Sequence, residues 1–452
     1  VVELDAASEA DSTWGTSITV TESKEVYGWG YSGDGYGGYG PLGKNGTFTS
    51  PIKVSNINTA VGVALGGTDH AQFTYILKED GTVSSLGYND YGQLGNGTTT
   101  SSTAQDVKNV TDIVQVSGSQ NGYFGAFVKK DGTVWTVGNN GKGQLGDGSA
   151  INKSKPVQVG GGSSNAMKLR NGAVLENDGV TVAKDRNGKD LIYNKKDELL
   201  TNLYIEEDQK FRIDSDIQVE KSFSLLKANA KVNPKDLTYT VFDERFATVE
   251  KDSNGNGIVI PKSGIYGVAI ILVKDSNSGY GSILRLGIRP KDSVAMPMVS
   301  AGSAHVVALK ANGTVWTWGY NRYGQLGDGK NRNTNIPVQV LTGAQDSNSG
   351  YLENIIQVAA GSTHNLALAK DGTVWSWGYG PHGELGNGTT ANSSLPVKVI
   401  GVSDVVSIAA GYYSSFAVRK DGTVWAWGYN YAGQLGLGDG TNRTTAQQVL
   451  GG

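Results

Sequence analysis

The sequence predicts an all-β fold, namely a β-propeller built from repeats of about fifty residues and interrupted by an inserted β-sandwich. The phrase Asp-Gly-Thr-Val-Trp-x-Trp-Gly recurs along the chain, and each copy is followed by Gly-Gln-Leu-Gly or a close variant. Copies recur at about fifty to sixty residues, since Gly81 and Gly132 are 51 residues apart, Gly313 and Gly372 are 59 apart, and Gly372 and Gly422 are 50 apart. Between residues 159 and 293 the repeat stops, which indicates an insertion of about 130 residues.

Each repeat has the pattern of a strand, a tight turn and a second strand. In the fifth copy the apolar segment 365–368 precedes Asp371-Gly372, a pair that supplies the positive φ angles of a two-residue hairpin. Residues 373–377 then alternate as a pleated strand with one buried face should. The leucine of Gly-Gln-Leu-Gly is expected to fill the core of its blade. Six copies are found, the first of them degenerate: Ser23–Gly30, Asp80–Gly87, Asp131–Gly138, Asn312–Gly319, Asp371–Gly378 and Asp421–Gly428.

The two ends of the chain fall on related positions of the repeat. Residues 1–7 align with 405–410, so the chain is expected to begin on a blade strand. The strand that should follow residues 447–450 is absent. We therefore expect residues 1–7 to pair beside the last blade, so that one blade is split between the termini. The alternative is a fragment of a longer surface protein.

These recurring phrases resemble the regulator of chromosome condensation repeat. The resemblance covers residues 1–160 and about 295–452, and it is specific because several motif elements recur together in the same order. It implies a closed propeller, which in that family has seven blades. Six copies are counted in this chain, so six and seven blades both remain open.

The inserted segment has a different pattern. Residues 237–250 alternate as strands, and a glycine turn then leads to the Gly-led strand 264–273. This phrase resembles the bacterial immunoglobulin-like family, which implies a small β-sandwich. The predicted organisation is repeats 1–3 over 1–160, a linker with hairpins over 161–195, the immunoglobulin-like insert over 196–290, and repeats 4–6 over 291–452.

Composition narrows the range of functions. The 452-residue chain has a net charge of −3 and no run of basic residues, so no nucleic-acid partner is expected. No apolar stretch of about eighteen residues exists, so no membrane span is expected. The absence of cysteine excludes disulfides and thiol catalysis, and it favours an extracellular or cell-surface protein of bacterial type.

Residues that could carry chemistry are few. His70, His305 and His364 could suggest a metal site, but all three occupy the same Gly-x-x-His slot of different repeats, which favours structural hydrogen bonding. Residues 252–257 fit only the first half of a calcium loop, and a hairpin turn is the favoured interpretation. No catalytic motif stands out, so the sequence predicts no enzyme activity, no cofactor and no metal.

Aromatic residues outside the repeat core are the stronger functional signal. Propeller loops gather at the two faces of the ring, and exposed tyrosines anchor interfaces. The candidate binding residues come from three loops: Tyr36, Tyr39, Tyr123, Phe124, Tyr412 and Tyr413.

The favoured hypothesis is a non-enzymatic bacterial surface or secreted protein that binds a protein or a cell-surface glycan, or associates with itself into a filament or layer. A secreted propeller that inhibits or regulates an enzyme is the alternative, because the first family includes inhibitors of β-lactamases with aromatic loops on one face. Guanine-nucleotide exchange, a role of the family in eukaryotes, is the third.

Overall fold

The structure, a computed structural model, describes residues 2–7, 15–33, 39–68, 71–160, 181–182, 203–206, 208–213, 234–277, 281–291, 293–344 and 350–450. The chain divides into two compact units. The first comprises Val1–Asn171 with Pro297–Gly452, and the second comprises Gly172–Met296. The second unit therefore interrupts the sequence of the first.

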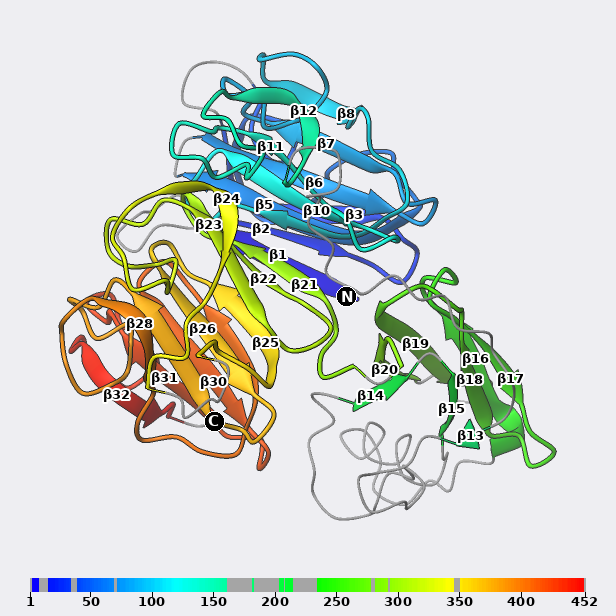
Figure 1. The fold of residues 1–452 in the computed structure, drawn as a ribbon. Coiled ribbons are helices and arrows are strands. Elements are labelled where there is room, and N and C mark those ends of the chain that lie inside the picture. Colours follow the sequence, from blue (N-terminus) through cyan, green and yellow to red (C-terminus); the bar gives the residue numbers. More distant parts are fainter. Residues whose placement is uncertain are drawn as a thin grey trace. The chain divides into compact units, whose positions relative to one another are not determined.

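Six four-stranded antiparallel sheets make up the described part of the first unit, and we call them blades 1 to 6 in chain order (Figure 1). Within each blade the four strands follow one another in sequence order. Blade 1 contains β1 (Glu3–Ala7), β2 (Thr16–Val20), β3 (Val26–Ser32) and β4 (Gly46–Lys53); blade 2 contains β5 (Ala60–Thr68), β6 (Ala71–Lys78), β7 (Val83–Gly87) and β8 (Ser102–Asp106); blade 3 contains β9 (Ile113–Gly118), β10 (Phe124–Lys129), β11 (Val134–Gly138) and β12 (Lys153–Gln158). Blade 4 contains β21 (Met298–Ala301), β22 (His305–Leu309), β23 (Val315–Gly319) and β24 (Thr334–Gln339); blade 5 contains β25 (Ile355–Ala360), β26 (His364–Ala369), β27 (Val374–Gly378) and β28 (Ser393–Lys398); blade 6 contains β29 (Val405–Ala410), β30 (Ser414–Arg419), β31 (Val424–Gly428) and β32 (Arg443–Gln448). The predicted all-β repeat fold is confirmed.

The repeated phrase forms the central hairpin of each blade. In blade 5 the turn between β26 and β27 has Gly372 at φ 84°, and the Asp371 carboxylate accepts the amide of Thr373 at 2.9 Å. The leucine of Gly-Gln-Leu-Gly lies in the core as expected, because Leu326 and Leu385 are fully buried. The carbonyl of Leu385 accepts the hydroxyl of Ser376, on β27, at 2.6 Å. The phrase therefore encodes both the hairpin and the loop that closes over it.

One hydrogen bond recurs where successive blades meet. The indole Nε1 of Trp318, on β23, donates to the carbonyl of Gln144 in the preceding blade at 2.9 Å. Trp377 donates in the same way to Gln325, at 3.0 Å. The acceptor is always the residue before the buried loop leucine, and the same bond joins Trp427 to Glu384 at 2.9 Å.

The first two junctions satisfy the same carbonyl with other donors. Blade 3 has Val137 in the tryptophan slot, and the carbonyl of Gln93 accepts the hydroxyl of Tyr75, which belongs to the same blade as Gln93, so this bond satisfies the carbonyl without crossing the junction. Between blades 1 and 2 the carbonyl of Pro41 accepts the hydroxyl of Thr74 at 2.7 Å. The acceptor position is thus retained even where the tryptophan is lost.

The first strand pairs differently from the expectation. β1 pairs with β2 inside blade 1, with Glu3 opposite Val20 and Asp5 opposite Ile18. Blade 6 takes all four of its strands from Val405–Gln448. The prediction that residues 1–7 pair beside the last blade is therefore wrong, because β2 offers them a complete antiparallel partner within their own repeat.

Two further four-stranded sheets belong to the second unit. One has the order β13-β15-β18-β17 and the other β14-β20-β19-β16. Their elements are β13 (Thr181–Val182), β14 (Leu203–Glu206), β15 (Gln209–Ile213), the 3₁₀ turn η1 (Pro234–Asp236), β16 (Leu237–Val241), β17 (Ala247–Lys251), β18 (Gly257–Pro261), β19 (Gly267–Asp275) and β20 (Gly281–Arg289). Most of the predicted linker, 161–195, lies outside the described residues.

Over the part of the chain that is described, no helix has the length and apolar character needed to cross a membrane.

The junction bond gives a test of stability. Trp318→Phe should lower the free energy of unfolding by about 2–4 kcal/mol, because it opens a cavity and leaves the buried Gln144 carbonyl without its donor. Urea unfolding of the two proteins measures the difference. Trp29→Phe is the matched control: Trp29 takes the same slot in blade 1 but is only half-buried, so its effect should stay below about 1 kcal/mol. Equal losses for the two variants would contradict the assignment.

Candidate functional site

A tyrosine follows the central hairpin of most blades. The glycine that ends the third strand has a positive φ, 104° at Gly319 and 105° at Gly378, and it turns the chain out of the sheet. Tyr320, Tyr379 and Tyr429 come directly after these glycines in blades 4 to 6, and the position three residues further holds Tyr323 in blade 4 and His382 in blade 5. The repeat therefore places aromatic rings in equivalent loops of successive blades.

The rings of blades 4 to 6 form a continuous series of contacts, which we call the aromatic arc. It consists of Tyr320, Tyr323, Tyr379, His382, Tyr412, Tyr413, Tyr429 and Tyr431. Contacts cross both blade borders, with ring centroids 4.9 Å apart between Tyr323 and Tyr379 and 5.0 Å apart between His382 and Tyr429. Edge-to-face and tilted contacts of this kind hold aromatic side chains in fixed orientations.

The arc combines rigid packing with exposed edges. Its rings are half-buried, except that Tyr431 is 77% exposed. Burial raises the pKa of Tyr413, assisted by a hydrogen bond with Tyr412, and burial likewise raises the pKa of Tyr379. These phenols therefore stay neutral at physiological pH and can offer hydroxyl donors beside an apolar ring face.

Three of the predicted binding residues lie among such rings. Tyr412 and Tyr413 belong to the arc, with their centroids 4.2 Å apart. Tyr123 lies in a second cluster, where it stacks on Tyr91 at 4.8 Å and contacts Tyr88 at 5.5 Å.

The other three predicted residues lie elsewhere. Phe124 is fully buried and packs in a core cluster with Leu145 and Trp318, so it belongs to the core rather than to a binding face. Tyr39 is 46% exposed in the loop of blade 1, with no ring contact to the arc. Tyr36 lies outside the described residues.

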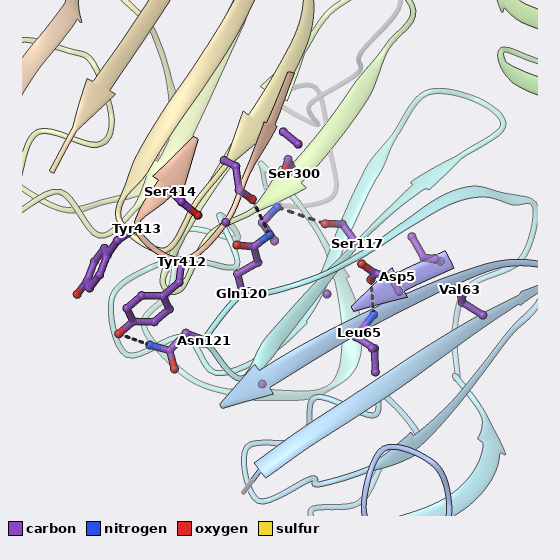
Figure 2. A pocket seen from close by; sticks show the side chains of 18 of the residues that line it. Asp5, Val63, Leu65, Ser117, Gln120, Asn121, Ser300, Tyr412, Tyr413 and Ser414 are labelled. Carbon is purple, nitrogen blue, oxygen red and sulfur yellow. Dashed lines mark hydrogen bonds between the residues drawn. The ribbon is translucent and has the colours of Figure 1, made fainter. Parts of the chain in front are cut away.

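A central cavity of about 540 Å³ lies beside the arc (Figure 2). Its lining includes Asp5 of blade 1, Ser117 of blade 3 and Tyr412 of blade 6. The loop after β9 crosses this space: Gln120 Nε2 donates to the carbonyl of Ala410 at 3.1 Å, and Asn121 Nδ2 donates to the Tyr412 hydroxyl at 3.0 Å. This bond anchors Tyr412, a member of the arc, to the loop of blade 3.

The histidines of the repeat are structural where they are described. His305 and His364 are fully buried, and each Nε2 lies 3.0 Å from a polar atom of the next blade, Asn365 Oδ1 or Ser415 Oγ. Burial lowers the pKa of His305 to about 4 and that of His364 to about 3, so both rings are neutral. His70 lies outside the described residues. Among those that are described, no three His, Cys, Asp or Glu side chains gather in a way that could hold a metal ion.

The predicted calcium-loop segment also forms a turn. Asp252 accepts the amides of Asn254 and Asn256 at 2.8 and 2.9 Å, and these bonds close the hairpin between β17 and β18. Its carboxylate is therefore occupied within the turn.

One acidic residue lies beneath the arc. Glu384 stands where four of the other repeats have glutamine, and it is fully buried. Its Oε2 accepts the amide of His382 at 2.8 Å, whereas its Oε1 has no hydrogen-bond partner. Burial raises the pKa of Glu384 from 4.5 to about 7. The carboxyl group is thus partly protonated near neutral pH.

This raised pKa predicts a pH-dependent stability. In the unfolded chain the Glu384 carboxyl ionises above about pH 4.5, whereas in the folded protein it keeps its proton up to about pH 7. The folded state is therefore most stable, with respect to this group, below pH 4.5, and it loses stability as the pH rises through about 7. Glu384→Gln should therefore match the wild-type protein near pH 4 and exceed it by about 3 kcal/mol at pH 8. Denaturant unfolding at both pH values tests this. The matched control, Gln325→Glu, introduces a carboxyl group at the equivalent buried position of blade 4. This variant should be less stable than the wild-type protein at pH 8. A pH-independent difference between wild type and Glu384→Gln would contradict the assignment.

Part of the chain matches a known repeat family. The model of the regulator of chromosome condensation (RCC1) repeat matches residues 131–170, 312–368, 371–418 and 421–449. The chain is 36% identical over 114 residues to the mitochondrial RCC1 domain-containing protein RUG3 of Arabidopsis thaliana, which covers 25% of this chain and 24% of that protein. It is 36% identical over 132 residues to the human E3 ubiquitin-protein ligase HERC2, covering 26% of this chain and 3% of the ligase.

The matched segments span a quarter or less of these relatives, so the match concerns the repeats alone. Among solved structures, human WBSCR16 is similar with a TM-score of 0.56 and 18% identity, covering 99% of this chain and 81% of that one. At this identity the likeness concerns the fold. The sheets, the recurring phrase and the matched model together show that this chain carries RCC1 repeats arranged as the blades of a β-propeller.

Proposed function

We propose that this chain is a non-enzymatic binding module and that it holds a protein partner through the aromatic arc. The observation that carries the proposal is the unbroken series of ring contacts from Tyr320 to Tyr431 across three blades. Tyrosine supplies large contact area with few rotatable bonds, and it is enriched at the energetic centres of protein interfaces.

Charge and rigidity favour the same assignment. The acid beneath the arc, Glu384, is buried and drawn toward its neutral form, so it places little negative charge under the rings. Lys142 Nζ lies 5.9 Å from the ring centroid of Tyr320, at the edge of the arc. A mainly neutral aromatic surface with a basic edge suits a partner that presents apolar and acidic side chains.

The proposed setting is the outside of a bacterial cell, with the second unit as an immunoglobulin-like spacer. The absence of cysteine and the strand pattern of residues 237–273 support it. Protease treatment of intact host cells tests the setting: an exposed protein is digested, whereas full protection would contradict it.

Binding is tested with an arc variant that leaves the core intact. Tyr323→Ser with Tyr431→Ser removes two rings with exposed edges, and Tyr351→Ser is a matched control because Tyr351 is 39% exposed and lies outside the arc, in the connection between β24 and β25. Immobilised wild-type and variant chains are incubated with the secreted and surface fraction of the host, and the retained partner is then purified for affinity measurement. We expect the arc variant to bind at least about 30-fold more weakly, since hot-spot tyrosines contribute about 2 kcal/mol each.

The control should bind within about twofold of wild type. Unchanged circular dichroism and thermal midpoint confirm that each variant folds. Retention that survives protease treatment of the fraction but not glycosidase treatment would make the partner a glycan and overturn the protein assignment. Equal retention by wild type and arc variant would overturn the arc as the binding surface.

A further inference from the structure

Three rings of the aromatic arc meet where blade 5 adjoins blade 6, and we call them the blade 5 cluster. Tyr413 lies 5.3 Å from His382 and 5.5 Å from Tyr379, measured between ring centroids. Tyr379 and His382 are in turn 6.0 Å apart. All three rings are half-buried, so each keeps part of its surface open to a ligand. The acid described above, Glu384, lies beneath this part of the arc.

The Glu384 carboxyl is positioned but not neutralised. Its Oε2 accepts the amide of His382 at 2.8 Å, whereas its Oε1 is buried and has no hydrogen-bond partner. Arg443, on β32, brings its backbone against Gly383, yet its guanidinium donates to Asp439 at 2.6 Å. Among the described residues, no cationic side chain pairs with the Glu384 carboxyl. A buried acid with one unused oxygen therefore lies under a group of aromatic rings.

The junction of blades 2 and 3 carries an equivalent cluster without the acid. Here Tyr123 occupies the position of Tyr413. It stacks on Tyr91 at 4.8 Å and lies 5.5 Å from Tyr88. Beneath these rings the position of the acid holds Gln93, which is fully buried and accepts the amide of Tyr91 through Oε1 at 3.1 Å. The two clusters share their loop positions and ring contacts, so the buried carboxyl is a specific feature of the blade 5 cluster.

We propose that the blade 5 cluster is a binding site for an organic cation, namely a basic side chain of the protein partner. A cation is attracted to aromatic ring faces within about 6 Å of the ring centroid. The carboxyl of Glu384 adds a second attraction, which is strong because burial leaves little water to screen it. The hydroxyls of Tyr379 and Tyr413 can accept hydrogen bonds from the N–H groups of the cation. The inference rests on the proposed role of the arc and adds the chemistry of one contact.

A basic side chain suits this site better than an apolar or acidic one. An apolar side chain would bring no partner for the charge of Glu384, and an acidic one would be repelled by it. Burial raises the pKa of Glu384 to about 7, so a cation that arrives near neutral pH stabilises the ionised carboxyl and releases its proton. Lys142 lies at the far edge of the arc, beside Tyr320. A partner with an acid at that edge and a basic residue at the blade 5 cluster would match both charges.

The test uses the whole chain and a small probe, Nα-acetyl-lysine methylamide. The norleucine analogue, which lacks the ammonium group, is the neutral probe. Ligand-observed NMR titrations measure both dissociation constants at pH 6 and pH 8. At pH 8 we expect the lysine probe to bind at least about tenfold more tightly than the neutral probe. At pH 6, where Glu384 holds its proton, the lysine probe should bind about tenfold more weakly than at pH 8, and the neutral probe should be unchanged.

Three variants separate the carboxyl from the titratable histidine beside it. Glu384→Gln gives blade 5 the glutamine of the other loops, and it should bind the two probes within about twofold of each other at both pH values. His382→Tyr supplies the ring that Tyr91 provides in blade 2, and it should retain the pH dependence. Gln93→Glu should add a second pH-dependent site for the lysine probe at the junction of blades 2 and 3.

Equal binding of the lysine probe by wild type and Glu384→Gln at pH 8 would overturn the proposal. A pH dependence that disappears in His382→Tyr but survives in Glu384→Gln would assign it to the histidine and would also overturn the role of the carboxyl. The probe does not involve the protein partner, so the two proposals fail separately. Absence of probe binding refutes the cation site alone, whereas probe binding with equal partner retention by wild type and the arc variant refutes the proposed function alone.

Discussion

The blade arrangement depends on one hydrogen-bond acceptor, the backbone carbonyl that precedes the buried leucine of each Gly-Gln-Leu-Gly loop. Trp318, Trp377 and Trp427 each direct an indole N–H at this atom of the preceding blade. Because the leucine is fixed in its own blade core, the carbonyl has a fixed position, and its bond to the next blade helps to orient blades 2, 4, 5 and 6. A buried carbonyl without a donor costs free energy, so the donor is replaced rather than lost where the tryptophan is absent.

The same constraint produces the aromatic arc. The loop that carries the acceptor also carries Tyr320, Tyr379 and Tyr429, and this loop presents their rings at equivalent positions in blades 4 to 6. Tyr323 and His382 thus reach the rings of the following blade at 4.9 and 5.0 Å. The arc is therefore a consequence of the repeat. Beneath it, blade 5 has Glu384 where blades 4 and 6 have glutamine.

Much of the blade structure could be predicted from the sequence, because the repeats allow equivalent positions to be compared. The hairpin turns, the buried leucines and the structural role of His305 and His364 followed from comparing equivalent positions, and the structure confirms them. The same comparison did not identify the arc: Tyr320 and Tyr379 recur at one position of the repeat, and alignment does not show that the rings of neighbouring blades meet on a surface. Phe124 looked like a loop residue beside Tyr123, yet β10 begins there and turns its ring into the core. The partner of residues 1–7 could not be predicted, since alignment identifies an inner strand but not the sheet that it joins.

The loop that crosses the central cavity has a consequence for how the propeller assembles. Gln120 and Ala410 are 290 positions apart in the chain, so their contact joins halves that are separated by the whole second unit. The connection from β12 to β21 is about ninefold longer than that from β24 to β25, yet the entropy of closing a loop grows only with the logarithm of its length, which adds about 2 kcal/mol. The insertion of the second unit between blades 3 and 4 therefore costs the first unit little free energy of folding. Contacts between residues this far apart in the chain slow folding, so the larger effect of the insertion is expected on the folding rate.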